Sequence, residues 1–492
     1  MNVMKKQEYD IVIVGGGNAG LVAAIEADNA GAKVLLIEKA PKKARGGNSR
    51  LSGGLFRIAC PGGTNDFEPL WKGTNLPRGD LEIEPYSKDD FYNKVIKLSE
   101  GWADRKFTEI FVEGSLQTVR WMKQQGLQWD IYPVHLVKKG DKLFATSGLI
   151  VLIANGAGEG LVEMLYGIVE KRGIDVLYET AGRELIVNPD GKVWGVVAKD
   201  PNGFMHIDAK SVILACGGFQ ANPEMRRRWL GENWDLIKLR GTRYDTGDGL
   251  KMAFDIGAQA IGHWGGCHAS VVSEDSPMIE AASAGSERYS YQYSIMVNRN
   301  GNRFVDEGED FLAYTYAKFG KEILKQPGGV AFQIYDAKTV PLLRVDYHGV
   351  EHVETDSLEE LAEELDINAE GFLKTVKEFN GAIIDEVPFI PNILDGLRTR
   401  GLKPDKTNWA QRIDTPPYQA YAVVCGLTMT YGGLKTNERA QVIDTSDHPI
   451  RGLYAVGEVT GGFFYHNYPS GTGLMRGAVM GRIAGAEAAA NV

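Results

Sequence analysis

The stretch YDIVIVGGGNAGLVAAIEADNAGAKVLLIE, residues Tyr9–Glu38, combines an apolar strand, a glycine-rich turn, a helix and a second strand. Gly15, Gly17 and Gly20 have the G-x-G-x-x-G spacing, in which successive glycines make the turn, admit a pyrophosphate and pack the helix on the strand. Amides at the helix start favour phosphate oxygens. The second strand ends at Glu38, where such a motif requires an acid for a ribose diol. The stretch therefore predicts a dinucleotide site.

A second glycine-rich stretch, residues 45–54, follows this acid closely and reads RGGNSRLSGG. A turn needs fewer glycines, so the stretch predicts a loop that lies along an extended cofactor, with a flexible surface loop as the alternative. Asn48, Ser49 and Ser52 would offer hydrogen bonds to that cofactor.

The composition is that of a globular enzyme with more than one domain. The 492 residues are too many for one simple core, and 43% hydrophobic and 24% charged residues are ordinary values. The formal charge of -10 argues against nucleic acid or an acidic membrane surface as the main partner. The 60 glycines exceed the usual share of about 7%, which indicates a backbone wrapped closely around a large ligand.

The four cysteines are scattered and form no C-x-x-C pair. This argues against zinc, haem and iron–sulfur sites, so no metal is expected, and reduced thiols fit a cytoplasmic protein. The N-terminus enters a core strand after few polar residues, which leaves no room for a signal peptide. No apolar run reaches the roughly 20 residues of a membrane span.

The middle of the chain predicts alternating helices and strands. Apolar residues at helical spacing predict a helix at 107–125, and two strands flank the turn at 188–191 as a hairpin. Residues 149–160 also carry glycines, but their spacing departs from the dinucleotide motif, so they predict a helix start. The stretch Thr246-Gly247-Asp248-Gly249 opens a further helix, in which Asp248 is either a cap or a cofactor ligand.

From about residue 273 to 415 the chain becomes richer in aromatic and charged residues, which indicates an inserted domain. Asn300-Gly301 predicts a hairpin between strands at 295–297 and 303–305. An acidic helix begins at the capping residue Ser357.

The C-terminal part supplies two more segments that suit a cofactor. Residues 452–462, GLYAVGEVTGG, predict a strand that ends in an acid and glycines. The turn SGTG at 470–473 feeds a helix at 474–490. The positive end of that helix would stabilise the negative charge of a reduced flavin.

Five segments, taken in order, make the chain resemble the flavoprotein family of fumarate reductases, succinate dehydrogenase flavoprotein subunits and ketosteroid dehydrogenases. They cover nearly the whole chain and lie at 15–20, 46–49, 214–219, 246–249 and 457–462. The resemblance implies FAD as the cofactor. It also implies an α/β fold, in which a Rossmann-like FAD-binding domain at 1–272 and 415–492 carries an inserted α+β capping domain at 273–414 that is mobile over the flavin.

One difference from succinate dehydrogenase indicates how FAD is attached. The histidine that binds FAD covalently in succinate dehydrogenase has no counterpart beside Asn48-Ser49. We therefore expect non-covalent FAD. Together, the motifs and the resemblance assign these cofactor-binding residues: Gly15, Gly17, Asn18, Ala19, Gly20, Glu38, Lys39, Gly46, Gly47, Asn48, Ser49, Ser52, Gly53, Gly54, Ala181, Gly182, Ala215, Cys216, Gly217, Thr246, Gly247, Asp248, Gly457, Glu458, Ser470, Gly473 and Leu474.

Within this family the chain looks most like the FAD-dependent tricarballylate dehydrogenases. The likeness rests on GGNS at 46–49, RGTR at 240–243, DEGEDF at 306–311, KTNWA at 406–410, DTPPY at 414–418 and TYGGLK at 430–435.

The chain departs from the fumarate reductases at the groups that hold their substrate. Met429 and Tyr468 stand where that family carries a histidine and an arginine, and Val340 falls at its catalytic arginine, with Arg344 one turn further on. A plain C4-dicarboxylate fumarate reductase is therefore not the first expectation. Ketosteroid dehydrogenases resemble the chain at Tyr468-Pro469-Ser470-Gly471, where their tyrosine polarises a ketone.

Tyr468 is accordingly the first candidate for a catalytic contact with the substrate, with packing as the alternative. Four charged residues of the insert are further catalytic candidates, each with a surface or structural role as the alternative: Arg288, Arg303, Glu307 and Arg344.

Three tyrosines of the insert share one face of an expected strand, because Tyr289, Tyr291 and Tyr293 alternate in sequence. A tyrosine that carries protons could come from this face, and packing is the alternative.

The function implied is that of an FAD-dependent dehydrogenase or reductase that desaturates a carbon pair next to an activating carboxylate or carbonyl, or reduces the alkene. A tricarballylate-like acid is the first substrate class. A cyclic ketone, a fumarate-like acid, and a flavin electron carrier or redox sensor without an organic substrate are the alternatives. With no haem or cluster motif, the chain needs a separate electron acceptor, either a quinone or a redox protein.

Overall fold

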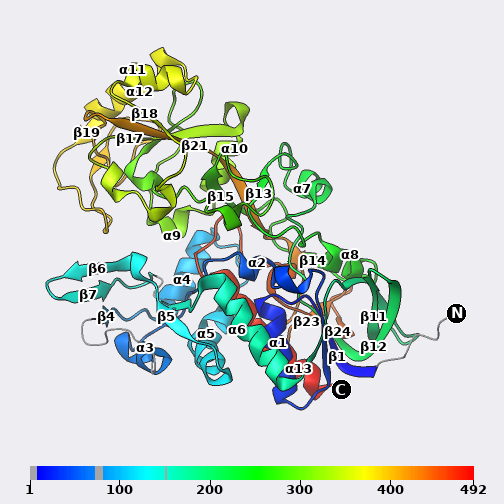
Figure 1. The fold of residues 1–492 in the computed structure, drawn as a ribbon. Helices are drawn as coiled ribbons and strands as arrows, with labels where there is room; N and C mark the ends of the chain where they lie inside the picture. Colours follow the sequence, from blue (N-terminus) through cyan, green and yellow to red (C-terminus); the bar gives the residue numbers. More distant parts are fainter. Residues whose placement is uncertain (1–7, 72–80, 150–151) are drawn as a thin grey trace. The chain divides into compact units, whose positions relative to one another are not determined.

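The computed structural model describes residues 8–71, 81–149 and 152–492, which form two compact units (Figure 1). Unit 1 holds the described residues up to Asp235 together with Gly241–Cys267 and Met429–Val492. Unit 2 holds Leu236–Arg240 and His268–Thr428. The expectation about the extreme N-terminus and part of the glycine-rich segment at 149–160 lie outside the described residues. The domain boundaries expected at 272/273 and 414/415 stay a prediction.

Unit 1 is organised around an eight-stranded sheet with a parallel centre. Its hydrogen-bonded order is β10 (Ala181–Val187), β11 (Val193–Asp200), β12 (Gly203–Leu214), β1 (Glu8–Val14), β2 (Val34–Ile37) and β9 (Asp175–Leu177), with β24 (Pro449–Ala455) beside β12 and β23 (Gln441–Ile443) beside β24. The pairs β12–β1, β1–β2, β2–β9 and β12–β24 are parallel, whereas β10 and β11 form the expected antiparallel hairpin.

The centre of this sheet is apolar because helices and other strands cover both faces. Val12, Leu35, Val212 and Leu453, one from each of four parallel strands, are fully buried in one core. The mixed α/β fold expected from the sequence is confirmed.

Two helices of unit 1 pack closely because glycines remove side chains between them (Figure 1). These are α1 (Asn18–Asn29) and α13 (Thr472–Ala490). A Cβ on Gly481 would lie 2.6 Å from the Ala19 carbonyl oxygen, and one on Gly485 would lie 2.5 Å from that of Ala23. The other helices are α2 (Gly47–Arg50), α3 (Thr64–Trp71), α4 (Lys88–Leu98), α5 (Arg105–Gln125), α6 (Ala157–Arg172), α7 (Pro223–Trp229) and α8 (Asp248–Phe254).

Smaller sheets complete unit 1. One joins β3 (Leu55–Phe56), β8 (Leu152–Ala154) and β5 (Trp129–Ile131); a second joins β4 (Leu81–Ile83), β7 (Lys142–Ala145) and β6 (Leu136–Lys139); a third pairs β14 (Ala260–Ile261) with β22 (Gly433–Leu434).

Unit 2 is an α+β arrangement around a six-stranded sheet. The order is β13 (Lys238–Leu239), β21 (Tyr418–Thr430), β17 (Val330–Tyr335) and β16 (Ile295–Val297), and β15 (Cys267–Ser273) and β18 (Val353–Thr355) also pair with β21. The remaining elements are β19 (Ile383–Ile384), β20 (Arg398–Thr399), α9 (Leu312–Thr315), α10 (Phe319–Leu324), α11 (Leu358–Glu364) and α12 (Ala369–Ala382).

Several local expectations are confirmed. The amphipathic helix at 107–125 is α5, capped by the Asp104 side chain, which accepts a hydrogen bond from the Phe107 N–H. The acidic helix is α11, and its cap Ser357 accepts a hydrogen bond from the Glu360 N–H.

Two expectations about unit 2 were met only in part or were wrong. The turn at Asn300-Gly301 forms and joins Val297 to Arg303 in an antiparallel bridge, but no strand forms at 303–305, and the strand pairing of β16 is with β17. Tyr291–Tyr293 is a 3-10 helix and no strand, so the three tyrosines do not share a face. A contact between distant residues accompanies this departure from the alternating pattern, because the Tyr293 hydroxyl donates a hydrogen bond to the Pro391 carbonyl, 98 residues away.

Candidate functional site

In unit 1 the carboxyl ends of parallel strands meet a helix N-terminus. β1 ends at Val14, level with the ends of β2 and β12. The Gly15 N–H donates to the Ile37 carbonyl, and the Ala215 N–H donates to that of Val14, so the chain turns sharply at the same edge. Helix α1 begins at Asn18 directly afterwards. Such an edge is where α/β sheets bind ligands.

Glycines make this edge a cradle. Gly15 has a φ of +108°, and a Cβ there would lie 2.5 Å from the Ala215 oxygen, so no other residue fits. Gly17 and Gly47 are less crowded, because a Cβ would make only ordinary contacts, with Ser49 Oγ at 3.5 Å and Asp245 Oδ1 at 4.0 Å, respectively. These two glycines belong to separate segments, and neither places a side chain on this edge.

Glu38 is buried at the end of β2, as the motif requires. Its two oxygens accept hydrogen bonds from the Gly16 N–H at 3.0 Å and the Ala40 N–H at 2.7 Å. Burial raises the pKa of this carboxyl, and the backbone donors oppose the rise. The Glu38 carboxyl group is thus fixed beside the glycine-rich turn at 15–20, where it can accept hydrogen bonds from a ribose diol.

Lys39 joins the segment at 246–249 to this edge. Its Nζ donates to Asp248 Oδ2 at 2.8 Å and to Thr246 Oγ1 at 2.5 Å. Asp248 does not cap α8, because the N-cap is Gly247 and no side chain caps the helix. The sequence left open whether Asp248 is a helix cap or a cofactor ligand, and the structure shows that it is not the cap.

Other residues expected around the cofactor serve the packing of this edge. Ser52 Oγ donates to the Ser49 carbonyl and accepts from the Gly54 N–H, so it closes the turn of its own loop, which includes Gly53. Cys216 is a partly buried thiol, and desolvation raises its pKa to about 12. Gly46 caps α2, and Ala181 and Gly182 begin β10. Their assignment to the cofactor stays a prediction.

Two carboxyl groups lie beside the cradle, Asp245, which is buried, and Glu458, which is partly buried. The Gln220 side-chain amide donates to Asp245 Oδ2 at 2.6 Å and to Glu458 Oε2 at 3.4 Å. Glu458 also accepts from Asn48 Nδ2 at 3.2 Å and from the Thr430 N–H at 2.9 Å. Burial raises the pKa of Glu458 to about 7, and burial together with the charge of Glu458 raises that of Asp245.

Sequence reasoning identified Glu458 and missed Asp245 and Gln220. Each missed residue is adjacent to a recognised segment, since Asp245 precedes Thr246 and Gln220 follows Phe219. Their position next to a recognised segment could have marked them as candidates. Only the fold, however, brings residues 220, 245 and 458 together.

The N-terminus of α13 forms a second polar edge of unit 1. Tyr468 is buried, and its hydroxyl accepts a hydrogen bond of 2.9 Å from the Gly473 N–H in the first turn of α13. Burial raises the pKa of Tyr468, and the Gly473 N–H opposes the rise. Asn18 Nδ2 donates to the Leu474 carbonyl, which ties this helix start to α1. Tyr468, the first catalytic candidate from the sequence, is thus held at the N-terminus of α13.

Two arginines that the sequence did not single out flank this edge. Arg57 Nε donates to the Ser470 carbonyl at 2.8 Å. Arg476 Nη2 donates to the Gly457 carbonyl at 2.8 Å, and its guanidinium lies 4.5 Å from the centre of the Phe463 ring. Burial lowers the pKa of Arg476 to about 10. Both cations lie beside the turn at 470–473.

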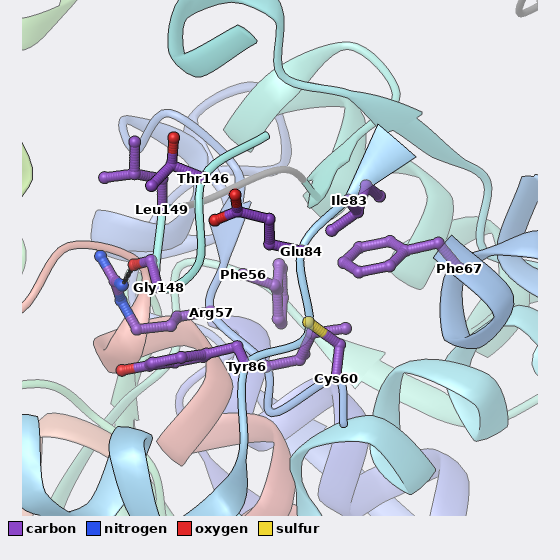
Figure 2. A pocket seen from close by; sticks show the side chains of 11 residues that line it. Phe56, Arg57, Cys60, Phe67, Ile83, Glu84, Tyr86, Thr146, Gly148 and Leu149 are labelled. Atoms are coloured by element: carbon purple, nitrogen blue, oxygen red, sulfur yellow. Dashed lines mark hydrogen bonds between the residues drawn. The ribbon is translucent and has the colours of Figure 1, made fainter. Parts of the chain in front are cut away.

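A small pocket of about 10 Å³, room for roughly one water molecule, adjoins Arg57 (Figure 2). Arg57 and Glu84 provide its charged groups, and the rest of its lining is largely apolar or uncharged: Phe56, Ile58, Cys60, Phe67, Ile83, Tyr86, Thr146, Gly148 and Leu149.

In unit 2 the catalytic candidates Arg303 and Glu307 form a buried ion pair. Glu307 Oε1 accepts the Met296 N–H at 2.7 Å, and Arg303 Nη1 donates to the Pro404 carbonyl at 3.0 Å. The pair therefore holds β16 to neighbouring loops, which is a structural role. A catalytic role for either residue stays a prediction.

The other two charged candidates also bind neighbouring parts of unit 2. Arg288 donates to the carbonyls of Gly285, Glu287 and Asp346. Arg344 Nε donates to Asp346 Oδ2 at 3.0 Å. The catalytic assignment of both arginines stays a prediction.

A polar cluster that the sequence did not assign lies elsewhere in unit 2, around Arg240. Its guanidinium pairs with Glu287 and donates to Thr428 Oγ1 at 3.2 Å. Burial acts to raise the pKa of Glu287, but the charge of Arg240 outweighs it and keeps that pKa below its usual range. We call Arg240, His268, Ser270, Glu287, Tyr289, Tyr316 and Thr428 the Arg240 cluster.

His268 enters the cluster from β15. Burial and the charge of Arg240 lower its pKa to about 3, so the imidazole is neutral at physiological pH. Its Nδ1 lies 3.2 Å from Ser270 Oγ, and its ring packs edge-on against Tyr316 at 4.7 Å. The cluster therefore offers one cation, one carboxylate and several neutral hydrogen-bonding groups.

The parts of the chain that the structure describes contain neither a metal-binding cluster nor a helix that could span a membrane. In residues 8–71, 81–149 and 152–492, no group of three His, Cys, Asp or Glu side chains could hold a metal ion. Nor does any helix within these ranges have the length and apolar character to cross a membrane.

The first edge of unit 1 fits FAD on structural grounds. Gly17 and Gly47 place no side chain on the cradle, Glu38 provides a fixed acceptor, and Asn18 Oδ1 is buried at the start of α1 without a hydrogen-bond partner in the described residues. When bound, FAD supplies hydride and electron transfer.

Comparison with known proteins agrees with this geometry. The family described as FAD binding domain matches residues 10–474. A probable fumarate reductase, Ifc3, of Shewanella frigidimarina is 30% identical over 97% of this chain and 74% of its own. A urocanate reductase of Eggerthella lenta is 28% identical over 98% of this chain and 75% of its own.

A solved structure shows the same fold. The open conformation of a flavocytochrome c3 fumarate reductase matches with a TM-score of 0.73 and 28% identity, and the match covers 99% of this chain and 78% of that one. The cofactor expectation is thereby confirmed as FAD, while the likeness to tricarballylate dehydrogenases is not shown. The chain therefore belongs to the FAD-binding domain family and is an FAD-dependent oxidoreductase related to the fumarate reductases.

Proposed function

We propose that the protein interconverts a carbon–carbon single bond and a double bond next to an activating carboxylate or carbonyl group. One carbon exchanges hydride with FAD while its neighbour exchanges a proton with a side chain. The observation that carries this proposal is the Arg240 cluster, which places a buried guanidinium beside one carboxylate and several neutral hydrogen-bonding groups in unit 2. Relatives named as fumarate and urocanate reductases support it.

The Arg240 cluster suits the activating group of such a substrate. Arg240 Nε is buried without a hydrogen-bond partner in the described residues, so a donor remains for an oxygen. A carboxylate or carbonyl bound there would become more electron-withdrawing, which favours loss of the neighbouring proton. Glu287 balances the charge of Arg240, so one activating oxygen is bound without an excess of positive charge.

A tricarballylate-like acid is the first substrate that we propose. Support comes from the segments that resemble tricarballylate dehydrogenases and from Met429 and Tyr468, which replace the groups that hold a C4-dicarboxylate. A fumarate-like acid is for that reason a lesser alternative.

A cyclic ketone of the ketosteroid type is the second candidate, and Tyr468 favours it. A phenol that accepts the Gly473 N–H at the positive end of α13 is suited to donate a hydrogen bond to a ketone oxygen. Steroid or cyclic ketone turnover that Tyr468→Phe abolishes would support this candidate over the first.

Electron exchange requires a second partner. We propose a separate quinone or redox protein, since the described residues include no metal cluster. We also propose non-covalent FAD and, since none of the four cysteines forms a disulfide, a cytoplasmic location. A flavin electron carrier with no organic substrate is the alternative of another class, and reduction of the flavin only by partner proteins would support it.

The experiment is anaerobic mixing of the oxidised holoenzyme with tricarballylate, other tricarboxylates, dicarboxylates and ketones, with flavin absorbance as the readout. Bleaching by an acid supports the proposal, and bleaching by ketones alone supports the second candidate. If no member bleaches the oxidised flavin and no unsaturated acid or enone reoxidises the reduced flavin, both candidates are contradicted. Flavin that trichloroacetic acid releases from the protein would show that the binding is non-covalent.

A further inference from the structure

Asp245 and Glu458, both in unit 1, lie on either side of one amide nitrogen. Gln220 Nε2 donates to Asp245 Oδ2 at 2.6 Å and to Glu458 Oε2 at 3.4 Å. Asp245 is 7% exposed and Gln220 is 0% exposed, while Glu458 is partly buried. Two carboxylates held this closely away from bulk water repel each other, so ionisation of both is costly.

The oxygen of the Gln220 amide is an acceptor in search of a donor. Gln220 Oε1 is buried and has no hydrogen-bond partner in the described residues. A Cβ on Gly218 would lie 2.8 Å from this oxygen and 2.4 Å from Glu458 Oε1, so the two oxygens border the same small space. A buried acceptor without a partner needs an explanation. A carboxyl group that carries a proton is a donor, whereas a carboxylate only accepts.

The two acids also border the glycine cradle for FAD. A Cβ on Gly47 would lie 4.0 Å from Asp245 Oδ1. Asn48, the next residue of that loop, donates to Glu458 Oε2 at 3.2 Å. A third acid of the cradle, Glu38, raises the pKa of Asp245 through its charge. A dinucleotide brings a negatively charged pyrophosphate to such a glycine-rich turn, which adds to the negative charge already there.

Two cations of the described residues act on these acids from other elements. Arg476 of α13 lowers the pKa of Glu458, and Lys39, which follows β2, lowers that of Asp245. Lys39 also forms a salt bridge of 2.8 Å with Asp248, so its charge serves two acids at once. The cations therefore reduce the repulsion between Asp245 and Glu458 only in part.

The balance of these effects favours a proton on one of the two acids. Desolvation raises the pKa of Glu458 to about 7. Desolvation and the charges of Glu458 and Glu38 raise the pKa of Asp245 well above its usual range. The thiol of Cys216, whose pKa is about 12, adds no charge. Because the repulsion exists only while both acids are ionised, a single proton removes it.

We propose that Asp245 and Glu458 share one proton when FAD is bound, so that the protein takes up a proton as it binds this cofactor above neutral pH. The negative pyrophosphate makes a second carboxylate beside the cradle more costly, which favours the protonated form. The proton comes from solvent and stays on a carboxyl oxygen, and no electron moves. By linkage, FAD and the proton strengthen the binding of each other by the same factor.

The test is the affinity of the holoenzyme for FAD between about pH 5.5 and 8.5, the range over which a group with a pKa near 7 titrates. The holoenzyme is diluted at each pH, and the fluorescence of released FAD gives the dissociation constant. Asp245→Asn and Glu458→Gln each remove one acid and keep an oxygen that can accept from Gln220. Asp255→Asn is the matched control, since Asp255 is an exposed acid at the C-cap of α8 in the same unit.

The wild-type dissociation constant should be nearly constant below about pH 7 and should rise above it by up to about tenfold per pH unit, the limit for one proton. Asp255→Asn should show the same rise. In Asp245→Asn and in Glu458→Gln the rise above neutral pH should be lost. At the highest pH, Asp245→Asn should bind FAD more tightly than the wild type, because the repulsion is gone. A merely structural role of Asp245 would weaken binding at every pH.

A wild-type dissociation constant that stays flat over this range overturns the inference, and this result needs no variant to fold. A rise above neutral pH that persists unchanged in Asp245→Asn and Glu458→Gln also overturns it. Weaker binding by the same factor at every pH in both variants would show that the two acids support only the fold. The proposed reaction does not depend on any of these results, since they concern the cofactor and not the substrate.

Discussion

The backbone N–H of Thr430 donates a hydrogen bond of 2.9 Å to the carboxyl group of Glu458, which is enclosed beside the FAD cradle of unit 1. Burial raises the pKa of Glu458 from 4.5 to about 7, and Asp245 is shifted in the same direction. Between these pH values the folded apoprotein binds more protons than the unfolded chain, so its stability should fall as pH rises from 4.5 to 7.

Glu458→Gln should remove this part of the pH dependence. The amide keeps an acceptor for the Thr430 N–H and does not titrate over this range. The measurement is the free energy of unfolding of apoprotein in denaturant at several pH values. One such group gives a slope of at most about 1.4 kcal/mol per pH unit, and an unchanged slope in the variant would contradict the assignment.

His268 should make unit 2 sensitive to acid. Its pKa falls from 6.5 to about 3 in the folded protein, so the unfolded chain binds more protons between those values. The stability present above pH 6.5 is therefore lost as pH decreases toward 3. His268→Gln should lose less stability than the wild type over this range, as followed by circular dichroism. An equal or larger loss in the variant would show that His268 titrates normally.

The contact between α1 and α13 should tolerate no side chain at Gly485. Its Cβ would lie 2.5 Å from the Ala23 carbonyl, so Gly485→Ala should lower the free energy of unfolding by about 1–3 kcal/mol and weaken FAD binding. Gly167→Ala on α6 is the control, because a Cβ there meets nothing within 4 Å and should stabilise the helix by up to about 1 kcal/mol. Equal effects of the two substitutions would argue against close helix packing.

The Arg303–Glu307 pair should contribute to stability and leave the chemistry unchanged. Glu307→Gln removes the charge that Arg303 pairs with inside unit 2, so the loss should be about 3–5 kcal/mol. Glu322→Gln, in an exposed pair with Lys325, should change stability by less than about 1 kcal/mol. If Glu307→Gln instead unfolds like the wild type but turns over far more slowly, the catalytic role expected from the sequence would be correct.

Much of unit 1 could be predicted because local rules and tertiary structure agree there. The spacing of Gly15, Gly17 and Gly20 and the acid at Glu38 follow from the geometry of a strand, turn and helix, which short-range sequence specifies. The parallel strands followed from the same segments, whereas FAD as the particular dinucleotide followed from the resemblance to the fumarate reductase family.

Unit 2 could be predicted less well because contacts between distant residues decide it. Asn300-Gly301 is a good hairpin turn, yet β16 pairs with β17, some thirty residues later in the chain. The alternation of Tyr289, Tyr291 and Tyr293 was overridden by contacts with Thr315 and Pro391. Likewise, no local pattern joins Arg240 to Glu287, 47 residues away.

The most direct test of the proposed function is anaerobic reoxidation of the chemically reduced holoenzyme by an unsaturated acid, with its saturated partner as the control. Aconitate, the desaturated form of tricarballylate, should restore the absorbance of oxidised flavin, and the product should be tricarballylate with one hydrogen from FAD and one from solvent. Tricarballylate should leave the reduced flavin unchanged. If neither aconitate nor any other unsaturated acid or enone restores the absorbance, while a quinone or a redox protein does, the protein is an electron carrier and the proposed chemistry is wrong.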